Sequence, residues 1–299
     1  MAVHIQIVGG GAIGLFVASL ASAARWKVTL VTRTEQQAAE LNKSQLICEQ
    51  LDGTRVSYPV SATTRLRDDC LTIITVKYHQ LPEIYKKLQQ CSAEMPLLFM
   101  QNGLAHYEEA LELPQQHIAF SSVQFGAQKL DSHRVAQRGA GVMKLAVARG
   151  EIEKFDKLHI LSSDAVRVQY EQQAEQMLFE KAILNCFINP LTAILQIKNG
   201  ELLRNKEAFF LMQSLYNEII LTFPDVQEIV SFADVQQLCE KTANNTSSML
   251  ADRLHHRKTE VETIVGAIIR RAENGQKAMP ILQTLYQLVK AFEESREGM

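Results

Sequence analysis

The alternation of strand-like and helix-like segments over the first 170 residues constrains the fold more than any other feature of the sequence. Short β-branched runs predict strands, and the segments between them have helical periodicity. Strands are expected at residues 3–9, 27–33, 71–77, 96–103 and 165–171, helices at 12–24, 34–45 and 78–91, and a hairpin-like region at about 118–148. Thr34 is a suitable N-cap for the second of these helices. Such an alternation predicts parallel strands joined by right-handed crossovers, which form a doubly wound sheet.

The pattern of predicted secondary structure changes near Tyr170. From about Glu171 to the C-terminus the strand signals disappear and helical patterns dominate. The chain has 299 residues, of which 46% are hydrophobic, and this is enough for two cores. We therefore predict an α/β protein in which a Rossmann-type sheet domain (1–170) is followed by an all-helical domain (171–299).

A glycine-rich segment, IVGGGAIG, joins the first expected strand to the first expected helix. It holds the spacing Gly9-x-Gly11-x-x-Gly14 at the place where a dinucleotide site requires it. The residues that would surround the pyrophosphate are Gly9, Gly10, Gly11, Ala12, Ile13 and Gly14. The free N–H groups at the helix N-terminus attract phosphates. The alternative interpretation is a tight glycine turn without a ligand.

The second strand ends in Thr32 and Arg33, where an NAD-binding fold usually carries Asp or Glu. A guanidinium pairs with a 2′-phosphate, whereas a carboxylate repels it, so we predict NADPH/NADP as the cofactor. An ordinary surface arginine is the alternative. Lys77 and Asn102 follow two further strands and would also lie at the carboxyl edge of the sheet. A solvated lysine and a turn-forming Asn-Gly explain them equally well.

A polar stripe crosses the apolar segment FEKAILNCFINPLT (179–192). Lys181, Asn185 and Asn189 follow one another at steps of four residues, which places them on one side of a helix. Pro190 is expected to stop or kink this helix. Facing a nicotinamide, Lys181 would protonate the alkoxide that hydride attack on a ketone produces, and the amides would hold the substrate. The alternative is a surface stripe in which Lys181 pairs with a carboxylate.

Composition and charge exclude several classes of function. The net charge of −2 and the absence of a long basic run argue against nucleic acid as a partner. The five cysteines are scattered, which disfavours a disulfide framework and a zinc site and suits a cytoplasmic protein. The uncharged stretch 5–24 resembles a signal peptide or membrane anchor, but no Lys or Arg precedes it and glycines interrupt it. We expect no membrane partner, and no metal at His255 and His256.

A second polar cluster lies in the segment NNTSSMLADRLHHRKTEVETIVG, where Ser248 and Glu260 stand out. Ser247 or Ser248 would cap the following helix, and Glu260 would be a solvated helix residue, if the cluster has only a structural role.

In order and spacing, GGGAIG, TVK, QNG, KAILNCFINPLTAILQIKNGEL and NTSSMLADRLHHRKTE resemble the ketopantoate reductase family over essentially the whole chain. This resemblance implies NADPH-dependent reduction of 2-dehydropantoate, a 2-keto acid, to (R)-pantoate, in the pathway to pantothenate and coenzyme A. It also implies an active site in the cleft between a Rossmann domain and a helical domain.

The resemblance assigns roles residue by residue. Lys181 would be the proton donor, while Asn102, Asn185, Asn189, Asn199 and Ser248 would bind the substrate. Asn102 would also touch the nicotinamide, and Glu260 would help to fix the cofactor. The glycine segment, Arg33 and Lys77 would bind NADP, with the Gly126–Ala127 stretch as a further lining. Val265 replaces an asparagine that is frequent in the family, and this departure is expected to affect local packing rather than chemistry.

Two alternatives remain open. One is a related reductase of another 2-keto acid, and the other is a non-catalytic NADP-binding redox sensor. The sensor would need the glycine segment but not the Lys181 stripe. The sequence leaves the oligomeric state open, because the apolar helices of the second domain would either fill a core or bury a homodimer interface.

Overall fold

The computed structural model describes residues 3–297, which form two compact units. Unit 1 comprises Met1–Gln101 and Tyr107–Met177, and unit 2 comprises Asn102–His106 and Leu178–Met299. The predicted Rossmann-type sheet domain followed by a helical region is confirmed. The division at residues 170 and 171 stays a prediction.

Unit 1 is built on an eight-stranded sheet with the order β12-β11-β8-β7-β6-β1-β2-β5. The strands are β1 (His4–Val8), β2 (Lys27–Val31), β5 (Ser61–Thr63), β6 (Leu71–Ile74), β7 (Leu97–Phe99), β8 (Ile118–Val123), β11 (Gly141–Arg149) and β12 (Val166–Tyr170). All pairs except β8–β11 are parallel.

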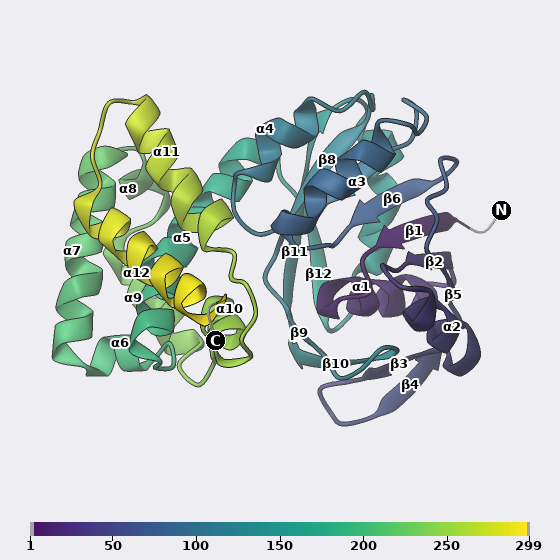
Figure 1. The fold of residues 1–299 in the computed structure, drawn as a ribbon, viewed down its shortest axis with the longest axis horizontal. Helices are drawn as coiled ribbons and strands as arrows, with labels where there is room; N and C mark the ends of the chain where they lie inside the picture. Colours follow the sequence, from purple (N-terminus) through teal and green to yellow (C-terminus); the bar gives the residue numbers. More distant parts are fainter. Residues whose placement is uncertain (1–2, 298–299) are drawn as a thin grey trace. The chain divides into compact units, whose positions relative to one another are not determined.

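Helices cover this sheet, which explains its continuous apolar strands. They are α1 (Ala12–Ala23), α2 (Glu35–Ser44), α3 (Leu81–Leu88), α4 (His106–Leu111) and the short η1 (Tyr78–Gln80), η2 (Ile152–Lys154) and η3 (Asp156–Leu161). In Figure 1 the central strands β1 and β6 lie between α1 and α3. Ile5 and Ile7 of β1 are fully buried, as is Leu15 of α1. The predicted cap is confirmed, because Thr34 Oγ1 accepts from Gln37 N at the start of α2.

A second, four-stranded sheet in unit 1 has the order β4-β3-β10-β9. Its strands are β3 (Leu46–Glu49), β4 (Arg55–Tyr58), β9 (Gly126–Lys129) and β10 (Arg134–Gly139). β9 and β10 form an antiparallel hairpin inside the region where a hairpin is expected. The sequence analysis did not predict β3 and β4, because these strands are short and β4 is half-exposed and polar.

Unit 2 is helical. It contains α5 (Ala174–Leu195, except for its first four residues), α6 (Glu201–Arg204), α7 (Lys206–Thr222), α8 (Val226–Ile229), α9 (Phe232–Lys241), α10 (Ser248–Leu254), the π-helix η4 (Glu262–Gly266), α11 (Ala267–Asn274) and α12 (Pro280–Glu297). The apolar residues of these helices form one core around α5.

Helix α5 is long and apolar enough to cross a membrane, yet most of its apolar stretch is buried inside the protein. Ala182, Ile183 and Phe187 of α5 are fully buried. The helix continues through Pro190, so the part of the expectation in which Pro190 stops it is wrong, and the kink stays a prediction. Pro190 removes the backbone donor for the Cys186 carbonyl, and the burial of the helix outweighs this loss.

A five-residue segment, Asn102–His106, belongs to unit 2 although unit 1 surrounds it in the sequence. It leaves β7 and attaches to η4, where Leu104 N donates to Thr263 O at 2.9 Å and Thr263 Oγ1 donates to Asn102 O at 3.2 Å. The chain therefore passes between the two units three times.

Candidate active site

The turn between β1 and α1 has the backbone geometry of a phosphate-binding loop. Gly9 has φ +121°, and a Cβ atom on Gly14 would lie 1.9 Å from Gly9 O. Gly11 is the N-cap of α1 and is exposed, and a Cβ atom there would meet nothing within 4 Å. Among residues 3–297 no side chain caps α1, whose first residues are Ala12 and Ile13. The first N–H groups of α1 thus have no side-chain cap, which fits the pyrophosphate of a dinucleotide.

Two side chains hold the carbonyl group of Gly10. Gln37 Nε2 of α2 donates to Gly10 O at 2.9 Å, and Lys129 Nζ of β9 donates to the same oxygen at 2.8 Å. The amide of Gln37 also donates to Ser132 O at 2.8 Å. The glycine turn is thus attached to α2 and to the second sheet. Gly126 and Ala127, at the start of β9, are half-buried.

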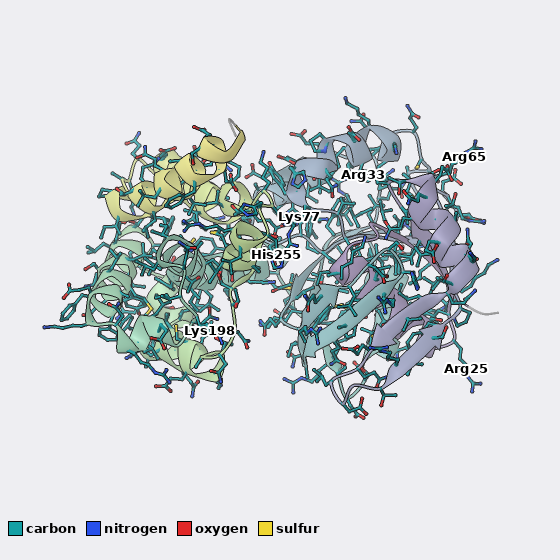
Figure 2. All side chains as sticks on the ribbon, turned by 60° about the horizontal axis from the view of Figure 1, so that its bottom comes forward. Arg25, Arg33, Arg65, Lys77, Lys198 and His255 are labelled. Atoms are coloured by element: carbon teal, nitrogen blue, oxygen red, sulfur yellow. The ribbon has the colours of Figure 1, made fainter. Side chains whose placement is uncertain are left out.

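The end of β2 presents a cation and no carboxylate. Arg33 follows β2 by two residues, is exposed, and is labelled in Figure 2. Thr32 beside it is buried. Lys77, also labelled in Figure 2, follows β6 by three residues and is half-buried at the start of η1. Both cations stand after the carboxyl ends of parallel strands, where ligands bind in open α/β sheets.

The polar stripe of α5 lies at the margin of the core of unit 2. Lys181 and Asn185 are half-buried, and Asn189 is only 6% exposed. Their neighbours Ala182 and Cys186 are fully buried. The stripe therefore borders the core of unit 2 rather than lying on a fully solvated face.

Asn102 joins Lys181 to Glu260. Lys181 Nζ donates to Asn102 Oδ1 at 2.9 Å, and Asn102 Nδ2 donates to Glu260 Oε2 at 2.8 Å. An amide is suited to this position, because one end accepts from an ammonium while the other donates to a carboxylate. The structure thus brings together three of the residues that the sequence analysis singled out.

Burial lowers the pKa of the Lys181 ammonium from 10.5 to about 8, and the negative charge of Glu260 opposes this shift. At neutral pH the amine is protonated but gives up its proton more readily than an ordinary lysine. A proton donor works best when its pKa lies near the working pH.

The backbone of Asn102 is fixed by the π-helix η4. Gly103 has φ +85°, and a Cβ atom there would lie 2.1 Å from Thr263 O, so glycine is required. Thr263 is fully buried and hydrogen-bonds the segment on both sides of Gly103. π-Helices occur frequently at functional sites. Val265, the departure from the family pattern, is also fully buried.

Asn199 and Ser248 are positioned by the segment that precedes α10. Asn199 is 7% exposed, and its Nδ2 donates to Thr242 Oγ1 at 3.0 Å. Ser247 caps α10 by accepting from Leu250 N at 3.1 Å, which leaves Ser248 exposed as the first residue of the helix. The alternative in which a serine caps the helix therefore applies to Ser247.

The sequence analysis missed three residues that support these groups, namely Gln37, Lys129 and Thr263. Lys129 lies two residues after the Gly126–Ala127 stretch, and Thr263 lies three residues after Glu260. The sequence around Thr263 gives no signal of its contact with Asn102, which lies far away in the sequence.

Comparison with known proteins gives consistent matches over nearly the whole chain. Residues 5–150 match the family described as "Ketopantoate reductase PanE/ApbA", and residues 173–293 match its C-terminal part. The chain is 32% identical to 2-dehydropantoate 2-reductase of Listeria innocua over 299 residues, which cover 98% of each protein. It is 33% identical to the Bacillus subtilis protein of the same name over 296 residues, which cover 97% of this chain and 98% of that protein.

A crystal structure titled as a probable 2-dehydropantoate 2-reductase from Bacillus subtilis has the same fold. The TM-score is 0.85 at 30% identity, and the match covers 97% of this chain and all of that one.

Proposed function

Because the chain belongs to the ketopantoate reductase PanE/ApbA family of oxidoreductases, we propose that it reduces 2-dehydropantoate to (R)-pantoate with NADPH. The observation that carries this proposal is the half-buried ammonium of Lys181, which Asn102 holds at 2.9 Å. A redox sensor would have no use for a proton donor at this position.

Bound NADPH supplies the hydride, which adds to the ketone carbon of the substrate. The ketone oxygen then gains an electron pair and a proton, so the product is the alcohol. Lys181 Nζ donates that proton, and its positive charge stabilises the oxygen while negative charge develops there. Asn102 and Glu260 orient the ammonium, since the amide of Asn102 bonds to both groups.

The amides near Lys181 supply the groups that would hold the substrate. Asn185 and Asn189 lie one and two turns further along α5. With Asn199 and Ser248 they offer donors for the carboxylate and donors and acceptors for the terminal hydroxyl group of 2-dehydropantoate. In this proposal Lys181 protonates the ketone oxygen, and the amides determine which substrate binds.

The NADP preference rests on unit 1. Arg33 provides a guanidinium at the end of β2, where a carboxylate would favour NAD. Lys77 adds a second cation after β6. The glycine turn and the first turn of α1 would hold the pyrophosphate, and Glu260 would help to fix the cofactor.

A direct assay tests the proposal. NADPH consumption by the purified protein is measured with 2-dehydropantoate, with pyruvate, and with trimethylpyruvate, which lacks the terminal hydroxyl group; each substrate is also assayed with NADH. We expect rapid turnover for 2-dehydropantoate with NADPH alone. Turnover of another keto acid would replace the substrate but keep the mechanism. Tight NADPH binding without any turnover would favour the redox sensor.

The cellular setting is part of the same proposal. We place the enzyme in the cytoplasm, in the pathway to pantothenate and coenzyme A.

The apolar helices of the enzyme fill the core of unit 2, as the burial of Met212, Leu215 and Ile219 on α7 shows. A homodimer therefore stays a prediction, which sedimentation velocity at several protein concentrations would test.

A further inference from the structure

Lys129 lies at the glycine turn, although it comes from the second sheet of unit 1. It is the last residue of β9, and its Nζ donates to Gly10 O at 2.8 Å. A lysine ammonium has three N–H donors. One donor is used on Gly10, and the others remain available to a ligand at this turn.

A second cation, Arg33, lies within electrostatic range of Lys129. Burial is the main cause that lowers the pKa of Lys129, and the positive charge of Arg33 lowers it further, while Asp131 opposes both. Among residues 3–297 neither Arg33 nor Lys129 forms an ion pair. The carboxylate of Asp131 instead accepts from Arg134 Nε at 2.5 Å and from two backbone N–H groups.

Arg33 and Lys129 repel each other, and Asp131, whose carboxylate also accepts from Arg134, offsets this repulsion at Lys129. An anion bound between the two cations would offset it at both side chains. The location identifies the anion. Arg33 stands at the end of β2, where dinucleotide-binding folds hold the adenosine ribose, and Gly10 belongs to the turn beside it. A dianionic 2′-phosphate has the charge and the acceptor oxygens to bind both side chains.

We propose that Lys129 binds the 2′-phosphate of NADPH together with Arg33, and so is a determinant of the preference for NADPH over NADH. This inference rests on the proposed function and assigns one more residue to its cofactor site. Arg33 supplies a planar pair of donors, and Lys129 supplies a point charge held in place by Gly10.

Calorimetric binding to the full-length protein tests this proposal without any turnover. The probes are adenosine 2′,5′-bisphosphate and AMP, which differ only in the 2′-phosphate, together with NADPH and NADH. Loss of one charge-assisted contact is worth about tenfold in affinity. We expect Lys129→Met to weaken the binding of adenosine 2′,5′-bisphosphate and NADPH about tenfold, and to change the binding of AMP and NADH by less than about twofold.

Three further variants complete the design. Lys129→Arg keeps the charge and should retain most of the affinity. Lys157→Met removes an exposed lysine of η3 and should change nothing. Lys129→Gln repeats the loss of charge with a polar side chain, so that a folding defect of one variant does not decide the outcome.

The possible results separate the two proposals. Equal weakening of all four ligands by Lys129→Met, or no weakening of any, would overturn the role of Lys129. If Arg33→Met abolishes the preference for NADPH while Lys129→Met leaves it intact, the NADPH proposal stands and the Lys129 inference fails. Equal affinity of the unmodified protein for NADPH and NADH would overturn both.

Discussion

Lys181 combines a charge that burial disfavours with a neighbouring carboxylate that favours it. Its pKa of about 8 places the change from ammonium to amine close to neutral pH. If Lys181 is the proton donor as proposed, reduction requires the ammonium, which prevails below this pH. The reverse oxidation of pantoate then requires the neutral amine, which prevails above it. The two directions of the reaction should therefore have opposite pH dependence.

We expect the rate of reduction to be constant below pH 8 and to fall about tenfold per pH unit well above it. The rate of oxidation should rise over the same interval. Steady-state kinetics from pH 6 to about pH 10 would measure both profiles.

In Lys181→Met both rates should fall about 100-fold or more, and NADPH should still bind. A Lys181→Met enzyme that keeps its activity would exclude Lys181 as the donor.

Glu260 should set the position of these profiles. Its negative charge raises the pKa of Lys181. In Glu260→Gln the fall in the rate of reduction and the rise in the rate of oxidation should therefore both occur at lower pH. Gln still offers an oxygen to Asn102 Nδ2, which keeps the hydrogen bond. Glu240→Gln changes an exposed residue of α9. It is the matched control and should leave both pH profiles unchanged. A shift of the profiles to higher pH in Glu260→Gln would contradict this electrostatic role.

At the level of single residues, the sequence indicated the candidate catalytic and binding groups but not the residues that hold them in place. Lys181, Asn185 and Asn189 were recognisable because polar groups at steps of four residues are costly within an apolar helix. Their assigned roles stay predictions. Thr263 and Lys129 were not recognisable, because their partners, Asn102 and Gly10, are more than 100 residues away in the sequence.

Among the elements, the π-helix η4 connects the Asn102 segment to the helical core. Thr263→Val keeps the shape of the side chain but leaves the partly buried carbonyl of Asn102 without the Thr263 hydroxyl as its donor. We expect a loss of about 1–2 kcal/mol in the free energy of unfolding. The value of kcat should fall, since the amide that orients Lys181 loses its anchor, whereas the Kd for NADPH should not change.

Thr263→Ser separates the hydroxyl from the rest of the side chain. It retains the donor to Asn102 and should recover most of kcat. Urea unfolding gives the stability of both variants, and steady-state kinetics gives kcat. Equal kcat values for the Val and Ser variants would show that the hydroxyl does not position Asn102.

The elements that the sequence predicted well are those with strong local signals. The apolar strands β1, β2, β6, β7 and β12 and helices α1, α2 and α3 all lie within the predicted segments. β3, β4 and β5 were missed because they are short and partly polar, so that pairing with distant strands decides their conformation. Pro190 misled for a related reason, since the burial of α5 outweighs the loss of one backbone hydrogen bond.

On the scale of the whole molecule, each unit has its own core, and the single tryptophan reports on one of them. Trp26 is buried in the core of unit 1. If NADP binds to unit 1 as proposed, NADP⁺ at 100 times its Kd should stabilise the Trp26 unfolding transition by about 2.7 kcal/mol. With the same amount of NADP⁺, Arg33→Met should be stabilised by about 1.4 kcal/mol less if it binds tenfold more weakly.

Urea unfolding followed by Trp26 fluorescence measures both values. Unfolding without NADP⁺ gives the intrinsic stability of each protein and serves as the control. A Trp26 transition that does not respond to NADP⁺ would contradict cofactor binding to the sheet unit.

The placement of Asn102–His106 limits how relatives of this enzyme can exchange parts. A chimera joined at Met177 and Leu178 would take Gly103 from one parent and Thr263 from the other. These two residues pack so closely that a Cβ atom on Gly103 would clash with Thr263 O. Transplanting the helical unit therefore requires the five-residue segment to move with it. In the evolution of such reductases, Lys181, its amide partner Asn102 and η4 should be inherited together, whereas the strands of unit 1 are freer to diverge.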